Sequence, residues 1–182
     1  MSTTQYGFYY DADRCIGCRA CVFACKDRND NEAGESLYWR TVTTVESGKI
    51  PNLRLSNQSL SCNHCAEPAC VAACPSKALS KRSDDGIVVV DKSKCVGCKA
   101  CGAACPYGVP QYGTDGKMQK CDLCLDDIKH GNKTACDSAC TGDALYAGPL
   151  NELARTWAKK SPVLMAGTTH PSLLFPKPKK PK

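Results

Sequence analysis

A stretch of alternating polar and apolar residues lies between positions 37 and 60. It reads LYWRTVTTVESGKIPNLRLSNQSL, and its two runs of alternation are separated by Ser47 and Gly48, a pair typical of turns. A period of two places successive side chains on the opposite faces of a strand. The stretch therefore predicts a β-hairpin.

Two further pairs of short apolar segments are similar to each other. Residues 78–81 and 87–91 flank the turn-forming sequence DDG, which predicts a second hairpin. The run IVVVDK in this hairpin has a counterpart in GFYYDA, and PSKALS has one in TGDALY. We therefore expect residues 6–11 and 144–147 to pair in the same way, although they are far apart in sequence. This arrangement predicts one unit inserted within the sequence of another.

The remaining segments carry weaker patterns. Residues 150–158 can form a short helix, and residues 106–120 read as a connector punctuated by glycine and proline. Beyond residue 159, the apolar pieces VLMAG and PSLLF predict an extended tail that lies across a neighbour or across its own surface, and PKPKKPK predicts a disordered end. No apolar run approaches the roughly 18 residues of a membrane-spanning helix, and the first residues lack the features of a signal peptide. We expect neither a membrane span nor a signal peptide.

Composition indicates that apolar burial alone does not hold the fold together. Leucine, valine, isoleucine and phenylalanine supply 30 of the 182 residues, about 16%, below the roughly 20% at which disorder becomes a risk. Cysteine supplies 16 residues. We therefore expect the chain to be cross-linked through cysteine.

All sixteen cysteines fall into groups of four, with none left over. The first and third groups have the spacing C-x2-C-x2-C-x3-C. The second has two extra residues before its third cysteine, and the fourth has a gap of eleven residues at that point. A proline follows the second and third groups. The groups are Cys15, Cys18, Cys21 and Cys25; Cys62, Cys65, Cys70 and Cys74; Cys95, Cys98, Cys101 and Cys105; and Cys121, Cys124, Cys136 and Cys140.

The tight spacing suits iron–sulfur clusters. Three thiolates in C-x2-C-x2-C can surround one cluster from a single loop, and Gly17 and Gly97 allow the backbone angles that such a loop needs. A helical turn then carries the fourth cysteine away, so that in bacterial ferredoxins it binds a neighbouring cluster. Three weaker alternatives stay open: disulfides, zinc throughout, and zinc in the fourth group alone, whose wide gap resembles that of a zinc ribbon.

The ferredoxin rule, applied to the paired groups, gives four ligand sets that each borrow one cysteine from another group. The simpler alternative is that each group of four holds its own cluster. Under the first scheme the sets are Cys15, Cys18, Cys21 and Cys140 (cluster one); Cys121, Cys124, Cys136 and Cys25 (cluster two); Cys62, Cys65, Cys70 and Cys105 (cluster three); and Cys95, Cys98, Cys101 and Cys74 (cluster four).

The remaining residues do not point to catalysis. His64, His130 and His170 form no recognisable set with serine and carboxylates, and no glycine-rich phosphate loop is present. His64 lies between two cysteines, where we expect a structural hydrogen bond near cluster three. The formal charge of +6 could suggest nucleic acid, but four clusters of about −2 each, thiolates included, would bring it to about −2. We expect a non-catalytic electron carrier without a nucleic-acid partner.

The motifs CNHCAEPACVAACP, CVGCKACGAACPYGVPQY and GKMQKCDLC carry a family resemblance. Over about residues 5–148 the chain resembles the four-cluster iron–sulfur subunit of the dimethyl sulfoxide reductase family of molybdenum enzymes. The resemblance implies an electron relay between a catalytic subunit with a molybdenum bis-pterin cofactor and a quinone-interacting membrane subunit. Cluster one would lie nearest the former and cluster four nearest the latter. Some relatives lack the cysteine at the position of Cys98 and hold a three-iron cluster there, so its presence here implies four 4Fe–4S clusters.

Together these observations predict an α+β fold of two bacterial-ferredoxin-like modules related by pseudo-two-fold symmetry. The outer module takes residues 1–30 and 112–148, the inner module 62–111, the β-hairpin insertion 31–61 and the extended tail 149–182. The expected partners are a molybdopterin-containing catalytic subunit and a membrane anchor. Clusters are assembled in the cytoplasm, and we expect the complex to work at the membrane, on either face. The alternatives are a polyferredoxin-like carrier for a hydrogenase or another soluble redox enzyme, and a zinc-organised interaction module.

Overall fold

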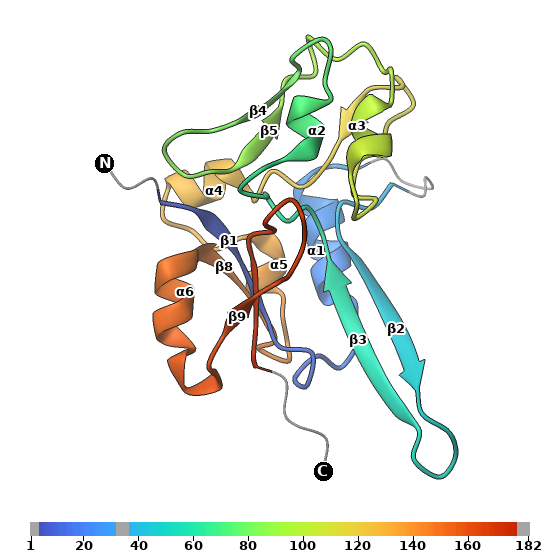
Figure 1. Ribbon diagram of the computed structural model, residues 1–182, viewed down its shortest axis with the longest axis vertical. Coiled ribbons are helices and arrows are strands. Elements are labelled where there is room, and N and C mark those ends of the chain that lie inside the picture. The colour runs from blue at the N-terminus through green and yellow to red at the C-terminus, as the bar shows by residue number, and fades with distance from the viewer. Residues whose placement is uncertain (1–3, 32–36, 178–182) are drawn as a thin grey trace.

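The computed structural model describes residues 4–31 and 37–177. Its largest sheet has four strands in the order β8, β1, β10, β9 (Figure 1). β1 pairs antiparallel with β8, and Tyr10 lies opposite Leu145, so the predicted pairing of residues 6–11 with 144–147 is confirmed. β10 lies parallel to β1 on its other side, and β9 pairs antiparallel with β10. The strands are β1 (Tyr6–Tyr10), β8 (Leu145–Pro149), β9 (Val163–Leu164) and β10 (Leu173–Phe175).

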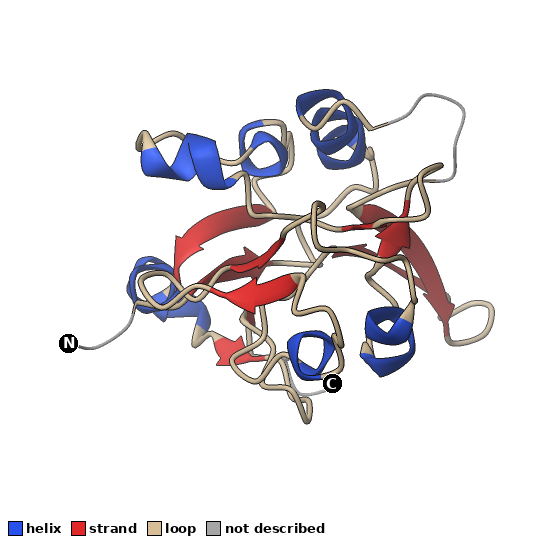
Figure 2. Cartoon of the chain, turned by 90° about the horizontal axis from the view of Figure 1, so that it is seen from above, coloured by secondary structure: helices blue, strands red, loops and turns tan. Residues whose placement is uncertain are grey.

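β1 is buried on both faces because its side chains alternate between two layers. Tyr9 packs with helix α6 (Leu150–Thr156) and stacks on Trp157, with ring centroids 4.7 Å apart. Phe8 and Tyr10 point the other way and pack among cysteines. Seen from above, the strands run through the middle of the molecule with helices on both sides (Figure 2). The sheet therefore has α6 on one face and the cysteine-rich core on the other.

Four helices each begin one residue before the third cysteine of a group, which confirms the predicted helical turn. Pro75 and Pro106 follow the fourth cysteines of the second and third groups, where proline cannot continue a helix. α1 packs beside α5, and α2 packs beside α3. No helix in the described ranges is long and apolar enough to cross a membrane. The helices beside the third cysteines are α1 (Ala20–Arg28), α2 (Ala69–Ala72), α3 (Ala100–Ala104) and α5 (Ala135–Ser138), and the others described besides α6 are α4 (Leu125–Lys129) and the 3-10 helix η1 (Ala158–Lys160).

Both predicted hairpins are present. β4 (Leu79–Lys81) pairs with β5 (Val88–Val90), and β2 (Thr41–Ser47) pairs with β3 (Arg54–Leu60) along its whole length. The β2–β3 hairpin extends away from the body of the molecule (Figure 1).

Two details of the strands differ from the prediction. The β2–β3 loop covers residues 48–53 instead of a tight turn at Ser47 and Gly48, because the chain reverses where Asn52 N donates to Lys49 O at 2.6 Å. The connector 106–120 contains a small unpredicted pair, β6 (Gln111–Tyr112) with β7 (Met118–Gln119).

The tail beyond residue 149 lies on the chain's own surface, which is one of its two expected arrangements. α6 confirms the helix expected at 150–158, and the extended pieces β9 and β10 join the four-stranded sheet. The approach of β10 depends on Gly7, because a Cβ atom there would lie 2.1 Å from the carbonyl oxygen of Ser172. The tail is therefore part of the fold and not a loose appendage. Its expected disordered end includes residues 178–182, which lie outside the described residues.

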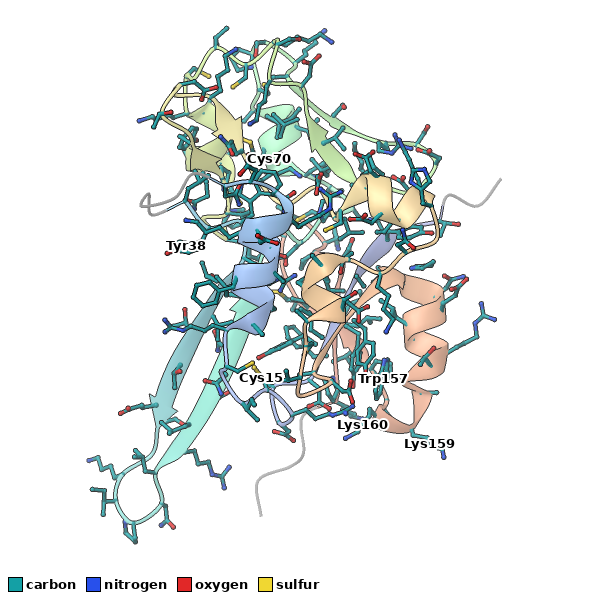
Figure 3. The ribbon with its side chains drawn as sticks, turned by 180° about the vertical axis from the view of Figure 1, so that it is seen from behind. Cys15, Tyr38, Cys70, Trp157, Lys159 and Lys160 are labelled. Atoms are coloured by element: carbon teal, nitrogen blue, oxygen red, sulfur yellow. The ribbon has the colours of Figure 1, made fainter. Side chains whose placement is uncertain are left out.

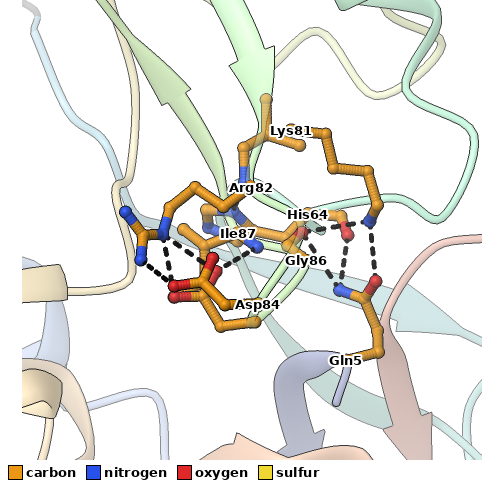
Figure 4. A network of polar contacts seen from close by, with 9 residues as sticks. Gln5, His64, Lys81, Arg82, Asp84, Gly86 and Ile87 are labelled. Carbon is orange, nitrogen blue, oxygen red and sulfur yellow. Dashed lines mark hydrogen bonds and ion pairs between the residues drawn. The ribbon is translucent and has the colours of Figure 1, made fainter. Parts of the chain in front are cut away.

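A polar joint connects the start of β1 to the β4–β5 hairpin (Figure 4). Gln5 Nε2 donates to the carbonyl oxygens of His64 and Gly86, each at 3.2 Å. Lys81 Nζ donates to Gln5 Oε1 at 2.6 Å and to Gly86 O at 3.0 Å. The joint fixes the segment before the first cysteine group against the segment that links the second and third groups.

Candidate metal centres

All sixteen cysteines lie within the described residues, and none of them forms a disulfide. Their neighbours in space differ from their neighbours in sequence. Burial raises the pKa of the Cys25 thiol to about 12, Arg40 opposes the rise, and the nearby Cys136 and Cys124 thiols add to it. Since α1 packs beside α5, the last cysteine of the first group lies among cysteines of the fourth.

A cavity between the first and fourth groups brings a further set of thiols together. Cys15, Cys18 and Cys21 line it together with Cys140. Cys140 is the last cysteine of the fourth group and lies among cysteines of the first, whereas Cys25 is the last cysteine of the first group and lies among cysteines of the fourth. Cysteines of the first and fourth groups therefore lie side by side at two places.

Cysteines of the second and third groups also lie near one another. Burial raises the pKa of Cys65, the hydroxyl of Thr169 lowers it, and Cys62 and Cys105 raise it. Cys105 closes the third group but lies near Cys65 of the second group. α2 and α3, which carry the third cysteines of these groups and end shortly before the fourth, pack side by side.

The fourth set of thiols lies in a small core of its own. Cys101 packs there with Leu79, Val88 and Met118, and the partly buried Cys74 and Cys95 pack against them. Cys74 therefore lies with cysteines of the third group. Cys98, from the same C-x2-C-x2-C loop, is exposed.

These four sets of thiols adjoin one another in the molecule. One core cluster contains Cys21, Cys121, Cys136 and Cys62, so the first three sets adjoin. Cys70 packs against the core around Cys101, so the third and fourth sets adjoin as well. In Figure 3, Cys15 lies in the lower half of the molecule and Cys70 in the upper half. The four sets together form a continuous line of thiols. The functional conclusion rests on this observation.

Polar groups point at the cysteine sulfurs. Ala78 N donates to Cys74 Sγ at 3.3 Å, and Ala144 N donates to Cys140 Sγ at 3.2 Å, each amide four residues after its cysteine. Hydrogen bonds to the sulfurs help set the potential of an iron–sulfur cluster. Further polar contacts to sulfur join Thr141 to Cys18, Ser59 to Cys21, Asn29 to Cys25, Thr169 to Cys65, Tyr112 to Cys101, Thr134 to Cys136, and the amides of Met118 and Leu123 to Cys95 and Cys121.

The loops of the first and third groups share one backbone conformation. Gly17 and Gly97 have φ angles of 72° and 71°, and Arg19 and Lys99 have φ angles of 61° and 62°. The prediction that these glycines supply unusual backbone angles is confirmed. The repeated left-handed positions curl each loop so that its three thiols face one side.

Sequence reasoning missed two buried cations, Arg40 and Lys120, which are 2% and 4% exposed. Arg40 Nη1 donates to Ser59 Oγ at 3.0 Å, and Nη2 donates to Ser61 Oγ at 2.8 Å. Burial lowers the pKa of Arg40, but neighbouring thiolates, Cys136 foremost, raise it above its usual value. A charged residue just before a strand reads as solvent-exposed in the sequence, so only the fold reveals this burial.

His64 takes the structural position expected from its place between two cysteines. It is fully buried, and Val88 N donates to its Nδ1 at 3.0 Å. Burial lowers the pKa of His64 well below its usual value, and Lys120 and Lys81 lower it further. The ring is therefore neutral and joins the second cysteine group to β5.

The donor sets fit iron–sulfur clusters. Burial raises the pKa of Cys70 and of Cys124 to about 11, so these thiols stay protonated unless a metal compensates their charge. Iron does so by binding the thiolate, which couples metal binding to folding. Within residues 4–31 and 37–177, no three metal-binding side chains are close enough for one ion. A 4Fe–4S cluster places its four thiolates on four different iron atoms, so its ligands stand farther apart than those of a single ion.

Comparison with known proteins gives consistent matches. A family model for a 4Fe-4S dicluster domain matches residues 54–150, and one for a 4Fe-4S binding domain matches residues 6–27. A component of the anaerobic dimethyl sulfoxide reductase of Escherichia coli (strain K12) is 43% identical over 97% of this chain and 87% of its own length. The thiosulfate reductase electron transfer subunit PhsB of Salmonella typhi is 41% identical over 82% of this chain and 79% of its own length. A component of the sulfite dehydrogenase of Allochromatium vinosum is 37% identical over 82% of this chain and 70% of its own length.

Proposed function

This protein belongs to the 4Fe–4S dicluster family of iron–sulfur electron-transfer subunits, and we propose that it relays electrons between a molybdopterin-containing catalytic subunit and a redox partner at the membrane. The resemblance inferred from the motifs is thereby confirmed. The chain is a non-catalytic subunit of an oxidoreductase, and its sixteen cysteines hold four 4Fe–4S clusters. When bound, each cluster supplies a one-electron redox centre.

The cross-ligated scheme is our proposal for how the cysteines divide. Cys25 lies beside cysteines of the fourth group, and Cys140 shares a cavity with the first. Cys105 lies beside the second group, and Cys74 packs with the third. The proposed ligands are Cys15, Cys18, Cys21 and Cys140 for cluster one; Cys121, Cys124, Cys136 and Cys25 for cluster two; Cys62, Cys65, Cys70 and Cys105 for cluster three; and Cys95, Cys98, Cys101 and Cys74 for cluster four.

The same pairings support two related modules. α1 with α5 and β1 with β8 belong to the outer module, and α2 with α3 and β4 with β5 belong to the inner one. The proposal is a pseudo-two-fold relation between them. Residues 62–111 form the module inserted between residues 1–30 and 112–148, residues 31–61 form the hairpin insertion and residues 149–182 form the tail.

The two ends of the line of thiols are the proposed points of electron entry and exit. Cys18 is exposed near Ile16, which is 70% exposed, and Cys98 is exposed near Val96, which is 71% exposed. An apolar side chain next to an exposed ligand suits a surface that a partner covers and dries. The catalytic subunit is the proposed partner at the Cys18 end, and a quinone-linked membrane subunit is proposed at the Cys98 end. Assembly would take place in the cytoplasm, and the complex would work on either membrane face.

Replacing Cys98 with Ser in the complete complex tests the direction of this relay. Turnover driven by quinol should fall towards background, because the electron enters at the altered end. Turnover driven by an artificial dye that reduces the catalytic subunit directly should persist. Lys94→Gln, an exposed change in the same loop region, is the matched control and should leave both activities unchanged. Undiminished quinol-driven turnover, with cluster four altered, would exclude electron entry at the Cys98 end.

A further inference from the structure

Two cations are buried in the cysteine-rich core without a carboxylate beside them. Arg40 and Lys120 donate only to neutral oxygen atoms in the contacts that the structure gives. Within residues 4–31 and 37–177, no carboxylate lies at ion-pair distance from either side chain. A buried charge is costly unless an opposite charge compensates it, and arginine cannot lose its proton. The compensating charge must therefore come from elsewhere in the core.

Arg40 lies between the thiols of clusters one and two. Its Nη1 donates to Ser59 Oγ, which is 3.6 Å from Cys21 Sγ of the cluster-one set. Its guanidinium carbon lies 4.6 Å from the ring centre of Phe8, which packs in the same core cluster as Cys121 of the cluster-two set. The guanidinium is thus held on neutral partners within reach of both sets.

Lys120 lies between the thiols of clusters two and three. Its Nζ donates to the carbonyl oxygen of Cys121, a cluster-two ligand, at 2.8 Å and to that of Val88. Val88 N in turn donates to His64, in the loop that supplies cluster-three ligands. Val88 also belongs to the small core against which Cys70, a cluster-three ligand, packs.

Each cluster with its four thiolates carries about −2 when oxidised, and one more negative charge when reduced. These anions are the counter-charges that Arg40 and Lys120 lack. The interaction acts in both directions, because a fixed cation favours the reduced, more negative state of each cluster it faces. We propose, on the basis of the function proposed above, that Arg40 raises the potentials of clusters one and two and that Lys120 raises those of clusters two and three. Cluster two faces both cations.

The test is an EPR-monitored redox titration of the intact complex carrying Arg40→Gln or Lys120→Gln, with iron content measured in parallel. Arg40→Gln should lower the potentials of clusters one and two, and Lys120→Gln those of clusters two and three. We expect each ratio of reduced to oxidised cluster, at fixed applied potential, to fall about tenfold, or about 59 mV for a one-electron couple. Arg40→Lys and Lys120→Arg keep the charge and should stay near the wild-type potentials. Arg155→Gln and Lys159→Gln remove the same charge at exposed positions, where solvent screens it, and should shift none.

The outcomes separate this inference from the proposed function. Four titrating clusters whose potentials do not change in Arg40→Gln and Lys120→Gln, or change equally in all four, would overturn the role of the cations and leave the relay intact. A wild-type complex without four titrating clusters would overturn the relay itself. If Arg40→Gln loses iron while Arg40→Lys keeps it, the charge is needed for assembly, as counter-charges require. If Arg40→Gln and Arg40→Lys both lose iron, the role of the buried charge is decided by comparing Lys120→Gln with Lys120→Arg in the same way.

Discussion

Thr169 Oγ1 donates a hydrogen bond to Cys65 Sγ at 3.3 Å, although the two residues are 104 positions apart. Tyr107 OH lies 3.1 Å from the same Thr169 oxygen and can donate to it, so the threonine hydroxyl is oriented towards the sulfur. Backbone bonds reinforce the contact, since Ala66 N donates to His170 O and Ser172 N donates to Asn63 O, each at 2.9 Å. The tail thereby clamps the loop that carries the first cysteines of the second group.

Thr169→Val should lower the potential of the cluster that Cys65 binds, with little change in shape or volume. In the wild-type protein this hydrogen bond favours the reduced cluster, so its loss lowers the potential. A hydrogen bond with a net contribution of about 1 kcal/mol corresponds to a shift of at most roughly 40 mV for a one-electron couple. Redox titration followed by EPR measures the shift.

Thr169→Ser keeps the hydroxyl and is the matched control, which should behave like the wild-type protein. If Thr169→Val and Thr169→Ser shift the potential equally, the loss of the hydrogen bond does not account for the shift.

Gly17→Ala should make cluster one easier to lose. The position has a φ of 72°, which costs a residue with a Cβ about 1 kcal/mol or more. A Cβ would also lie 2.8 Å from Asn57 Oδ1, and Asn57 Nδ2 holds the carbonyl oxygen of Cys15 at 2.9 Å. The rate at which iron is released to a chelator measures the effect.

Gly131→Ala is the control for backbone strain alone, because Gly131 has a similar φ of 76° and no atom within 4 Å of the added Cβ. It should leave iron release unchanged. Equal release rates in the two variants would mean that the contact of Gly17 with Asn57 does not support the cluster.

Folding should depend on the metal. The purified protein should contain about 16 iron atoms per chain, four per cluster, with matching acid-labile sulfide. Removing them with a chelator under oxidising conditions should abolish the cooperative melting transition, because metal binding supplies folding free energy. Stoichiometric zinc, or an iron-free chain that still melts sharply with native-like circular dichroism, would contradict this dependence.

The cysteine spacing was enough to predict the loops and helices that carry the cysteines, because the C-x2-C-x2-C geometry and the following helical turn are local. The repeated flanks of Cys15 and Cys95 were enough to predict the pairing of β1 with β8 across the sequence. The pairing of β10 with β1 was not predictable, since three apolar residues in a long tail carry no period. The burial of Arg40 was not predictable either, because a cation is buried only where the folded chain brings a compensating negative charge close to it. Long-range packing decides both features.

The division of the cysteines among the clusters is tested most directly by Cys74→Ser and Cys70→Ser, two changes four residues apart. EPR spectra of each variant should be compared with those of Cys98→Ser and Cys62→Ser. The cross-ligated scheme predicts that Cys74→Ser alters the same cluster signal as Cys98→Ser, while Cys70→Ser alters the signal changed by Cys62→Ser. If Cys74→Ser instead changes the cluster that Cys62→Ser changes, each sequence group holds its own cluster, and the cross-ligated scheme is wrong.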